Sequence, residues 1–543
     1  MWWKKLQLQA PFWIALVFII GFALFTRLYA LGEAPAGITW DEAALGYVGK
    51  MVIRTTRDEH LQRFPITFKS FGDFKSPLSF YLSGLSTTLF GLSAWAVRLP
   101  FALAGSASVG LIIWLSWKVL KNPWYALLSG FLLTVLPWHF LFSRIAFESG
   151  LTLFFFLTLL IGWLEARQEK TLSPWTSRFG FFLIAFGTVA SLYTYHAAKI
   201  VIPLTFLLIA VYELWYNRSW LWKKRVTILF TLGSMALLCL PLAWDILAGP
   251  GARRGFQTSF IGALPWQETL LLFFQNLASH LNLDFLLWGK TTTLRHNTPD
   301  YGVFFIGHLI LFWLGITFVL GRIIQRWQTP AKPSLLSRVR QFFQLRSTYQ
   351  QPLLRGWFWL ILLLIALVPA AIGTEIPHAN RSLLAIVPAI MLMTLGAREL
   401  QEELAPKAFA SLVGSLLLLI LLQFSSFWRY YFTDYQKAAS QDWLEGQRQA
   451  VQLARDYAES GKHIKFSSAY GQPMIFYAFY NAVPYEMYRQ FFIPGIDFGR
   501  VYVNDLNTYD VIFSTPYDPL PFEPDQIIYR QDDGAAYYVY EVE

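Results

Sequence analysis

The sequence has few charged residues and almost no cysteine. Asp, Glu, Lys and Arg make up only 14% of the 543 residues, whereas hydrophobic residues make up 55%. Soluble domains carry roughly 25% charged residues, so this balance excludes an ordinary soluble protein and predicts a multi-pass membrane protein. The single cysteine, Cys239, lies inside an apolar run, which excludes an internal disulfide.

Sequence signatures of metals, nucleotides and transporters are missing too. The chain has no H-x-x-x-H, C-x-x-C or Gly-rich phosphate loop. It therefore implies no cofactor, and a divalent metal is left open. No internal repeat is found, and neither is the inverted repeat that many transporters show.

Long apolar runs dominate what is present. A membrane-crossing helix needs about 20 apolar residues, and runs near that length occur at 11–30, 98–118, 124–141, 150–164, 179–195, 198–216, 226–247, 303–321, 356–373, 381–397 and 408–428. The first run follows Lys4 and Lys5 as in a signal peptide. It is too long for one and lacks a cleavage site, so we expect a retained span. The fold class predicted is a multi-pass α-helical membrane protein with about 11 to 13 spans.

Charge is distributed unevenly along the chain. Residues 434–543 contain 16 acidic and 8 basic residues, although the whole chain has a net charge of +10. The apolar part is therefore strongly basic. Because basic connectors stay in the cytoplasm, we expect a plasma (inner) membrane protein with a cytoplasmic N-terminus and an extracytoplasmic tail. Nucleic-acid binding is a poor explanation for this pattern.

Whether the run 78–92 crosses the membrane decides which connectors lie on the same side of it. The run is apolar but holds several Ser and Thr residues. If it does not cross, the basic connectors near 118–121, 167–178, 223–225, 322–355 and 398–407 all fall on the side of Lys4 and Lys5. We therefore predict a helix lying flat in the interface, within a first outer loop that extends over residues 31–97.

The sequence of the tail predicts a small α/β domain at residues 431–543, which follows a membrane domain at residues 1–430. A polar-faced helix is expected over 441–460, because Gly461 is a good residue to end it. Short strands are expected at 463–468, 511–514, 527–530 and 536–541, separated by Pro, Asp and Gly turns.

The first outer loop holds the most notable polar residues. Thr39 and Glu42 have the spacing of a helix capping box, so capping is the simpler interpretation of Thr39-Trp40-Asp41-Glu42. The alternative is that Asp41, with Glu42 beside it, acts as a general base at the bilayer surface. The helix that follows is expected to lie along the membrane surface.

A second group of charges lies further along that loop. Asp73 and Lys75 precede the interfacial helix, and they are either ordinary loop charges or a phosphate site. In the second interpretation Lys75 holds a phosphate at headgroup depth and Asp73 orients it.

Two other outer connectors carry polar residues. One contains His139, Arg144 and Glu148, where the spacing of four between Arg144 and Glu148 favours a structural helical pair. Their position at the end of a span also suits a cavity lining. Tyr195 and His196 end another span on the same side, and a hydrogen-bonded interfacial role is more common for such a histidine than metal binding.

Several motifs together resemble the C-fold glycosyltransferases. They are Asp-Glu after the first span, D-x-K-S-P-L at 73–78, F-G-x-S-A-W-A-V-R-L-P at 90–100, the P-W-H-F-L-F-S-R-I-A-F-E-S segment at 137–149, and H-A-N-R-S-L-L-A-I-V-P at 378–388. The branch of protein O-mannosyltransferases and lipid A aminoarabinose transferases is the most similar. The resemblance covers about residues 11–430, whereas the tail matches only in size and position.

The resemblance implies a glycosyltransferase that moves a sugar from a polyprenyl-phosphate carrier to an acceptor on the outer face, with inversion. Asp41 is then the catalytic base, and Lys75, Arg144 and Arg381 lie near the carrier phosphate. Glu148 occupies the place of a second acid, commonly Asp, in relatives. The implied partners are the lipid-linked donor, membrane lipids, and an acceptor that is a lipid, a glycan or a protein.

Two other classes of protein fit parts of the pattern. A transporter or flippase of a lipid-linked sugar would also bind this carrier, but it predicts charges in the middle of spans. A receptor or scaffold with a partner-binding tail would not need acids and bases clustered beneath that tail. The glycosyltransferase is therefore the favoured hypothesis.

Overall fold

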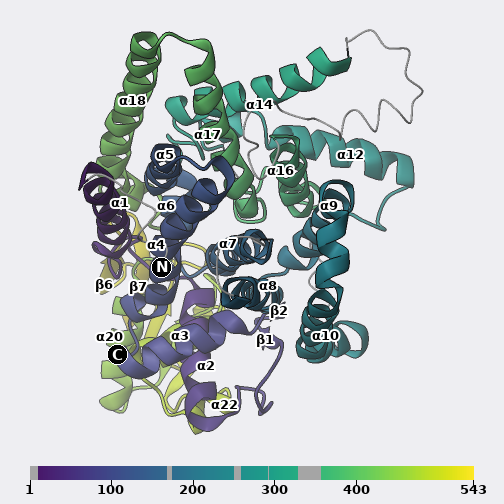
Figure 1. The fold of residues 1–543 in the computed structure, drawn as a ribbon. Coiled ribbons are helices and arrows are strands. Elements are labelled where there is room, and N and C mark those ends of the chain that lie inside the picture. The colour runs from purple at the N-terminus through teal and green to yellow at the C-terminus, as the bar shows by residue number, and fades with distance from the viewer. Residues whose placement is uncertain (1–9, 168–173, 250–258, 291–292, 328–355, 543) are drawn as a thin grey trace.

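The computed structural model describes residues 10–167, 174–249, 259–290, 293–327 and 356–542. Most of the chain is helical (Figure 1). The elements up to residue 248 are α1 (Ala10–Leu28), α2 (Trp40–Thr55), β1 (Phe68–Ser70), β2 (Asp73–Lys75), α3 (Leu78–Phe90), α4 (Ala94–Leu120), α5 (Pro123–Thr134), α6 (Pro137–Phe142), α7 (Glu148–Ala166), α8 (Pro174–Thr194), α9 (Ala198–Tyr216) and α10 (Arg218–Ala248).

The second half begins with further helices and ends in a mixed region. The helices up to residue 432 are α12 (Trp266–Ser279), α13 (Leu283–Leu286), α14 (Ile306–Trp327), α16 (Gly356–Ala371), the short 3₁₀ helix η2 (Leu383–Ala385), α17 (Ile386–Glu403) and α18 (Pro406–Phe432). The elements after that are α19 (Asp434–Ala438), α20 (Gln447–Glu459), β3 (Ile464–Ser467), α21 (Pro473–Asn481), α22 (Tyr485–Arg489), β4 (Ile496–Gly499), η3 (Val503–Asn507), β5 (Val511–Ser514), β6 (Gln526–Tyr529) and β7 (Ala535–Glu541).

The apolar runs form helices, as predicted. Among the described residues, eight helices are long and apolar enough to cross a membrane: α1, α4, α7, α9, α10, α14, η2 with α17, and α18. The run 124–141 is split into α5 and α6, because Pro137 has no N–H group to continue a helix and begins a new one instead. The expected total of 11 to 13 spans stays a prediction. The basic connectors at 168–173 and 328–355 lie outside the described residues.

The helix predicted at 78–92 is present and short. Its 13 residues extend for about 20 Å at ~1.5 Å per residue, which is less than the ~30 Å of a bilayer core. Its polar side faces the protein, where Ser86 and Thr87 donate to the carbonyls of Ala96 and Gly46. Leu89 and Phe90 are exposed instead. The exposed apolar side is one that could contact lipid, and the interfacial placement of this helix stays a prediction.

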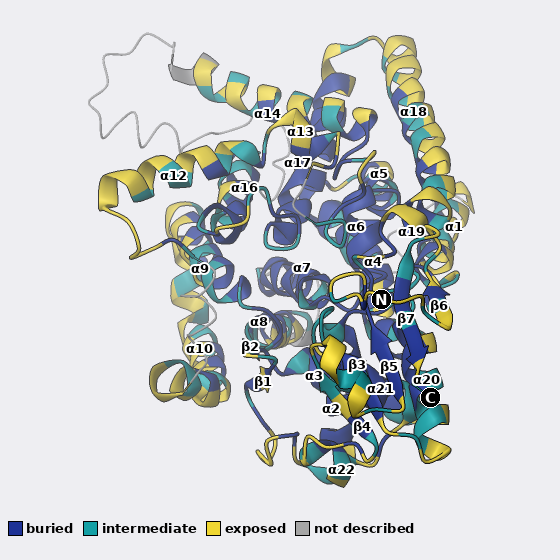
Figure 2. Cartoon of the chain, turned by 180° about the vertical axis from the view of Figure 1, so that it is seen from behind, coloured by how far each residue is buried: buried dark blue, intermediate teal, exposed yellow. Residues whose placement is uncertain are grey.

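The tail folds around a five-stranded sheet with the order β4-β3-β5-β7-β6. β3 is parallel to β4 and β5, whereas β7 is antiparallel to β5 and β6. The four predicted strands and the predicted helix are all found, while β4 and α21 were not predicted. The sheet lies at one end of the molecule, and the exposed apolar helices α10 and α18 lie away from it (Figure 2).

The tail shares one apolar core with the first outer loop. Helix α21 packs against α2, and the hydroxyl of Tyr47 donates to the carbonyl of Val483 at 2.7 Å. Leu45, Val48 and Val52 of α2 are buried in the same cluster as Phe476 of α21. The helix at 40–55 was therefore predicted correctly. The tail covers its apolar face, and its placement along the membrane surface stays a prediction. The domain boundary at residue 430 stays a prediction.

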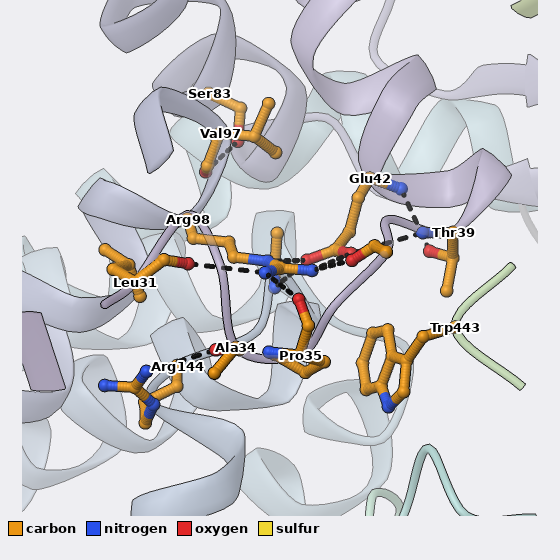
Figure 3. Close-up of polar contacts among 12 residues, drawn as sticks. Leu31, Ala34, Pro35, Thr39, Glu42, Ser83, Val97, Arg98, Arg144 and Trp443 are labelled. Carbon is orange, nitrogen blue, oxygen red and sulfur yellow. Dashed lines mark hydrogen bonds and ion pairs between the residues drawn. The ribbon is translucent and has the colours of Figure 1, made fainter. Parts of the chain in front are cut away.

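A buried ion pair fixes the chain just before α2. Arg98 of α4 donates to both carboxylate oxygens of Glu42, at 2.8 and 3.0 Å (Figure 3). The same guanidinium donates to the carbonyls of Leu31, Pro35 and Gly37. Neither side chain is exposed, so each charge depends on the other for compensation. Arg98 therefore holds the whole segment from residue 31 to residue 37 against α4.

Replacing Arg98 with Met should destabilise the fold strongly. Removing one partner of a buried ion pair leaves an uncompensated charge and costs about 3–5 kcal/mol, so the thermal unfolding midpoint should fall by many degrees. Lys462→Met is the control, because it breaks the solvent-exposed pair with Glu541 and should leave the midpoint nearly unchanged. Tryptophan fluorescence during heating of detergent-solubilised protein measures both. Equal midpoints for the two variants would contradict this role of Arg98.

Candidate functional site

A polar cavity of about 300 Å³ lies where the first outer loop meets the ends of several helices. It is lined from α2, β2, the start of α7, the connector between α8 and α9, and the segments around residues 295 and 378. Its charged and imidazole-bearing lining residues are Asp41, Lys75, Glu148, His196, Arg295, His296, Glu375, His378 and Arg381. Segments distant in sequence thus converge on one charged cavity.

Asp41 reaches this cavity from the first turn of α2. Thr39 caps the helix, since its hydroxyl accepts the amide of Glu42 while its own amide donates to the Glu42 carboxylate, both at 3.2 Å. The predicted capping box is confirmed. The cap fixes the first turn of the helix, and the side chain of Asp41 remains about one-third exposed.

Lys75 lies opposite Asp41 on the last residue of β2. Its ammonium is buried and forms an ion pair with the Asp41 carboxylate. The strand is held from its other side by His196, whose Nε2 donates to the carbonyl of Phe74 at 3.0 Å. Lys199 in turn donates to Nδ1 of this ring at 3.3 Å, which fixes the tautomer that donates through Nε2. The sequence placed Asp41 and Lys75 on one surface, and the structure places them in contact.

Glu42 and Asp73, both predicted for the site, do not line this cavity. Glu42 is fully buried, and one of its oxygens also accepts the amide of Ala146 at 3.0 Å. A catalytic role for Glu42 is inconsistent with a carboxylate committed to Arg98, to its own helix cap and to this amide. Asp73 accepts the amide of Phe74 at 2.7 Å. The carboxylate that pairs with Lys75 therefore belongs to Asp41 and not to Asp73.

Arg144 and His139 are also outside the cavity lining. Arg144 has no exposed surface and donates to the carbonyls of residues 26, 27, 30 and 34. It holds the end of α1, so phosphate binding is inconsistent with its position. His139 accepts a hydrogen bond at Nδ1 from Arg27 at 2.8 Å, deep in the helix bundle. Both residues act within the scaffold because their polar atoms face backbone and side chains of the membrane part.

Four other predicted residues do line the cavity: Glu148, Tyr195, His196 and Arg381. Glu148 starts α7, whereas Arg144 precedes that helix, so the helical pair between them is not formed. Glu148 pairs with no cation in the described part of the chain. The guanidinium of Arg381 lies close to Gly373, so a side chain at residue 373 would have to displace the end of the Arg381 side chain.

Sequence reasoning missed Arg295, His296 and His378, which all line the cavity. Arg295 lies over the ring of Trp40 at 5.5 Å, and its loop is tied to the tail by Tyr435, whose hydroxyl donates to the carbonyl of Leu294 at 2.7 Å. The only indication in the sequence was Leu-Arg-His at 294–296, in a long connector predicted to be on the outer side. The contact between Arg295 and Trp40 could not be predicted, because the two residues lie far apart along the chain.

His296 and His378 face each other, with ring centroids 4.6 Å apart. Burial, followed by the positive charges of Arg295 and Arg381, lowers the pKa of His296 to about 3. Burial, followed by the nearby charges, also holds the pKa of His378 well below its ordinary value. Both rings are therefore neutral at neutral pH. The positive charge of the cavity lining comes from Lys75, Arg295 and Arg381.

No group of three or more His, Cys, Asp or Glu side chains placed to hold a metal occurs among the residues that the structure describes. The described cavity instead combines three carboxylates with three permanent cations. Such a lining can bind a phosphate through its cations and deprotonate a hydroxyl through a carboxylate. It offers both functions within one cavity.

Residues 74–244 match the family model of dolichyl-phosphate-mannose-protein mannosyltransferases. A search of curated proteins finds no match. The matched segment begins at β2 and ends within α10, so it includes Lys75, Glu148 and His196. This match confirms the predicted resemblance for that part of the chain.

Two solved structures of ArnT from Cupriavidus metallidurans are similar over nearly the full length. The structure in the apo state has a TM-score of 0.54 at 12% identity, and covers 96% of this chain and 97% of that chain. The structure bound to undecaprenyl phosphate has a TM-score of 0.53 at 13% identity, with 98% of each chain covered. At this low identity the likeness concerns the fold. The chain is a multi-pass helical membrane protein with the fold of ArnT, and its residues 74–244 resemble the mannosyltransferase family.

Proposed function

We propose that this protein is an integral membrane glycosyltransferase. It moves a sugar from a polyprenyl-phosphate carrier to an acceptor hydroxyl, with inversion at the anomeric carbon. The observation that carries the proposal is the contact between Asp41 and Lys75 inside a charged cavity. The family match over residues 74–244 and the fold shared with ArnT, one structure of which holds undecaprenyl phosphate, support it.

A second, apolar cavity supports a lipid-linked donor. It has a volume of about 950 Å³ and is lined mainly by apolar and aromatic residues of α3, α8 and α10. Pro77 and Leu78 belong to its lining, and they follow Lys75 by two and three residues. A carrier whose phosphate binds at Lys75 can therefore place its isoprenoid chain in this apolar cavity without leaving the bilayer.

The reaction follows from the positions of the charges. The Asp41 carboxylate takes the proton of the acceptor hydroxyl as its oxygen bonds to the anomeric carbon. The bond from that carbon to the phosphate oxygen breaks, and the polyprenyl phosphate leaves with the electron pair. Lys75 stabilises the departing phosphate. Because a donor phosphate competes with Asp41 for the same ammonium, donor binding releases the carboxylate for its task as base.

Arg295 and Arg381 are proposed to bind the donor phosphate together with Lys75. Both line the cavity, and their guanidinium groups can make charge-assisted hydrogen bonds to phosphate oxygens. The neutral rings of His296 and His378 are suited to sugar hydroxyls. Glu148 lies on the same cavity wall as Phe147 and is proposed to orient the acceptor.

The ion pairs at the opposite ends of the helices support an extracytoplasmic site. Helices α7 and α9 begin at the cavity, and Lys118, Glu165 and Glu213 lie in the last turns of α4, α7 and α9. Lys118 pairs with Glu165 at 2.6 Å, and Arg167 pairs with Glu213 at 3.0 Å. Since basic residues collect on the cytoplasmic side, we place the cavity and the tail on the outer side of the plasma membrane, and the N-terminus inside.

Asp41→Asn should lower transfer strongly without weakening donor binding. Loss of a general base lowers turnover by about 10²–10⁴-fold, whereas Lys75 remains free to bind phosphate. A radiolabelled polyprenyl-phosphate sugar, incubated with the purified protein and candidate acceptors, measures the transfer. Glu33→Gln is the control, since Glu33 is an exposed acid of the same loop.

Near-normal turnover of Asp41→Asn would contradict the assignment of the base. The same assay separates the proposal from a transporter or flippase, because only a transferase forms a covalent bond between the labelled sugar and the acceptor.

Lys75→Ala and Arg295→Ala should each weaken the binding of polyprenyl phosphate by about 10–100-fold. A hydrogen bond to a charged group contributes about 1.5–3 kcal/mol, and tenfold corresponds to about 1.4 kcal/mol. Binding of a fluorescent polyprenyl phosphate to protein in nanodiscs measures the effect. Lys290→Ala is the matched control, because Lys290 belongs to the same connector as Arg295 but is exposed. Unchanged affinity of Lys75→Ala would remove Lys75 from the phosphate site.

A further inference from the structure

A separate cavity of about 250 Å³ lies between the first outer loop and the tail. One wall comes from Glu59, His60 and the tip of the hairpin formed by β1 and β2. The other wall comes from the start of α21, from Tyr488 of α22, and from Phe491 just after that helix. The hairpin and α22 lie at the same end of the molecule (Figure 1). None of the reaction steps above uses this cavity.

Its lining combines aromatic rings with hydrogen-bonding groups. Phe71, Tyr488 and Phe491 supply the rings, while Glu59 and Gln472 supply a carboxyl and an amide. Rings that stack on an apolar face, next to groups that both donate and accept, suit a polyhydroxylated ligand. The volume is too small for a lipid chain or a folded peptide and suits one sugar unit.

Glu59 is the buried polar group of this lining. Its side chain is 7% exposed, and burial raises its pKa to about 7, with a smaller opposing effect from its hydrogen bond to Tyr488. At neutral pH the carboxyl is therefore present in both protonation states. It can accept a hydrogen bond from a sugar hydroxyl or donate one to it.

The hairpin tip is held in a conformation that ordinary side chains rarely adopt. Phe71 has φ +54° and Gly72 has φ +79°, as a two-residue turn between antiparallel strands requires. Glycine adopts this conformation freely, but a phenylalanine there is uncommon. Such departures gather at functional sites. Here the turn carries the ring of Phe71 into the wall of the cavity.

Two connections join this cavity to the charged cavity. The first is β2, which leads from Gly72 to Lys75 over about 10 Å, at ~3.3 Å per residue. The second is a packing contact, since Gly471 lies against the ring of Trp40, and the next residue, Gln472, lines the smaller cavity. Trp40 itself lines the charged cavity. A ligand of a few units can therefore occupy both.

We propose that the smaller cavity binds a sugar unit of the acceptor, so that the acceptor carries carbohydrate. This inference rests on the proposed glycosyl transfer and identifies the class of its acceptor. The hydroxyl that receives the donor sugar lies at Asp41, and a neighbouring unit of the same glycan lies among Phe71, Tyr488 and Phe491. The tail thereby selects acceptors through this second contact.

Binding of saccharides without any donor tests the proposal. The full-length protein in nanodiscs is applied to an array of neutral disaccharides to tetrasaccharides built from glucose, galactose and mannose. The wild type should retain at least one of them. Phe491→Ala and Gln472→Ala should each lower that retention by about tenfold, which corresponds to losing about 1.4 kcal/mol.

Phe492→Ala is the matched control, because Phe492 is the adjacent residue, is similarly exposed and does not line the cavity. It should retain the saccharide as the wild type does. Phe491 is itself 59% exposed, so its replacement should not unfold the protein. Retention of no saccharide, or wild-type retention by both Phe491→Ala and Gln472→Ala, would overturn the proposal.

Asp41→Asn separates this inference from the proposed reaction. It should still retain the saccharide, because the side chains that line the smaller cavity do not include Asp41. Saccharide retention without any transfer from a polyprenyl-phosphate sugar would count against the proposed reaction but not against the proposed saccharide binding. Transfer that is insensitive to both the Phe491 and Gln472 variants would place the acceptor elsewhere.

Discussion

The buried ion pair between Glu42 and Arg98 is the constraint on which the site depends. A charge inside a protein is tolerated only when its hydrogen-bonding groups are satisfied, and here the satisfying groups come from distant segments. Glu42 accepts from Arg98, from Thr39 and from Ala146. Helix α2, helix α4 and the segment before α7 therefore meet at one carboxylate. The cavity lies beside this junction because Asp41 and Glu148 belong to the segments that the junction holds.

Two adjacent acids thus have different tasks. Consecutive residues of a helix point about 100° apart, so Glu42 can face the interior while Asp41 faces the cavity. The interior position demands a cation with several donors, and Arg98 supplies it. The cavity position pairs with Lys75, whose single ammonium can exchange partners. The pair of Glu42 and Arg98 therefore fixes the backbone, while Lys75 beside it can exchange Asp41 for another anion.

The sequence predicted features that depend on local pattern. The lengths of the apolar runs predicted the helices, and the spacing of Thr39 and Glu42 predicted the helix cap. The turn residues between short apolar runs predicted four strands of the tail. The sequence could not exclude Glu42 from the site, because the partner that holds Glu42 in the interior is Arg98, which is 56 residues away. It missed Arg295 for the same reason, since the ring of Trp40 lies far back along the chain. Arg144 and His139 were predicted for the site because they are polar residues at the end of an apolar run. In the structure Arg144 donates to backbone carbonyls, and His139 pairs with Arg27 of the scaffold.

The core shared by α2 and the tail has a consequence for how the protein is made. Tyr47 bonds to Val483, 436 residues later, and α2 packs on α21. Contacts of such sequence separation form late in folding. The helix that carries Asp41 therefore lacks its packing partner until the last part of the chain has been synthesised and delivered to the same side of the membrane. A chain that ends before α21 then carries α2 without the helix that packs on it.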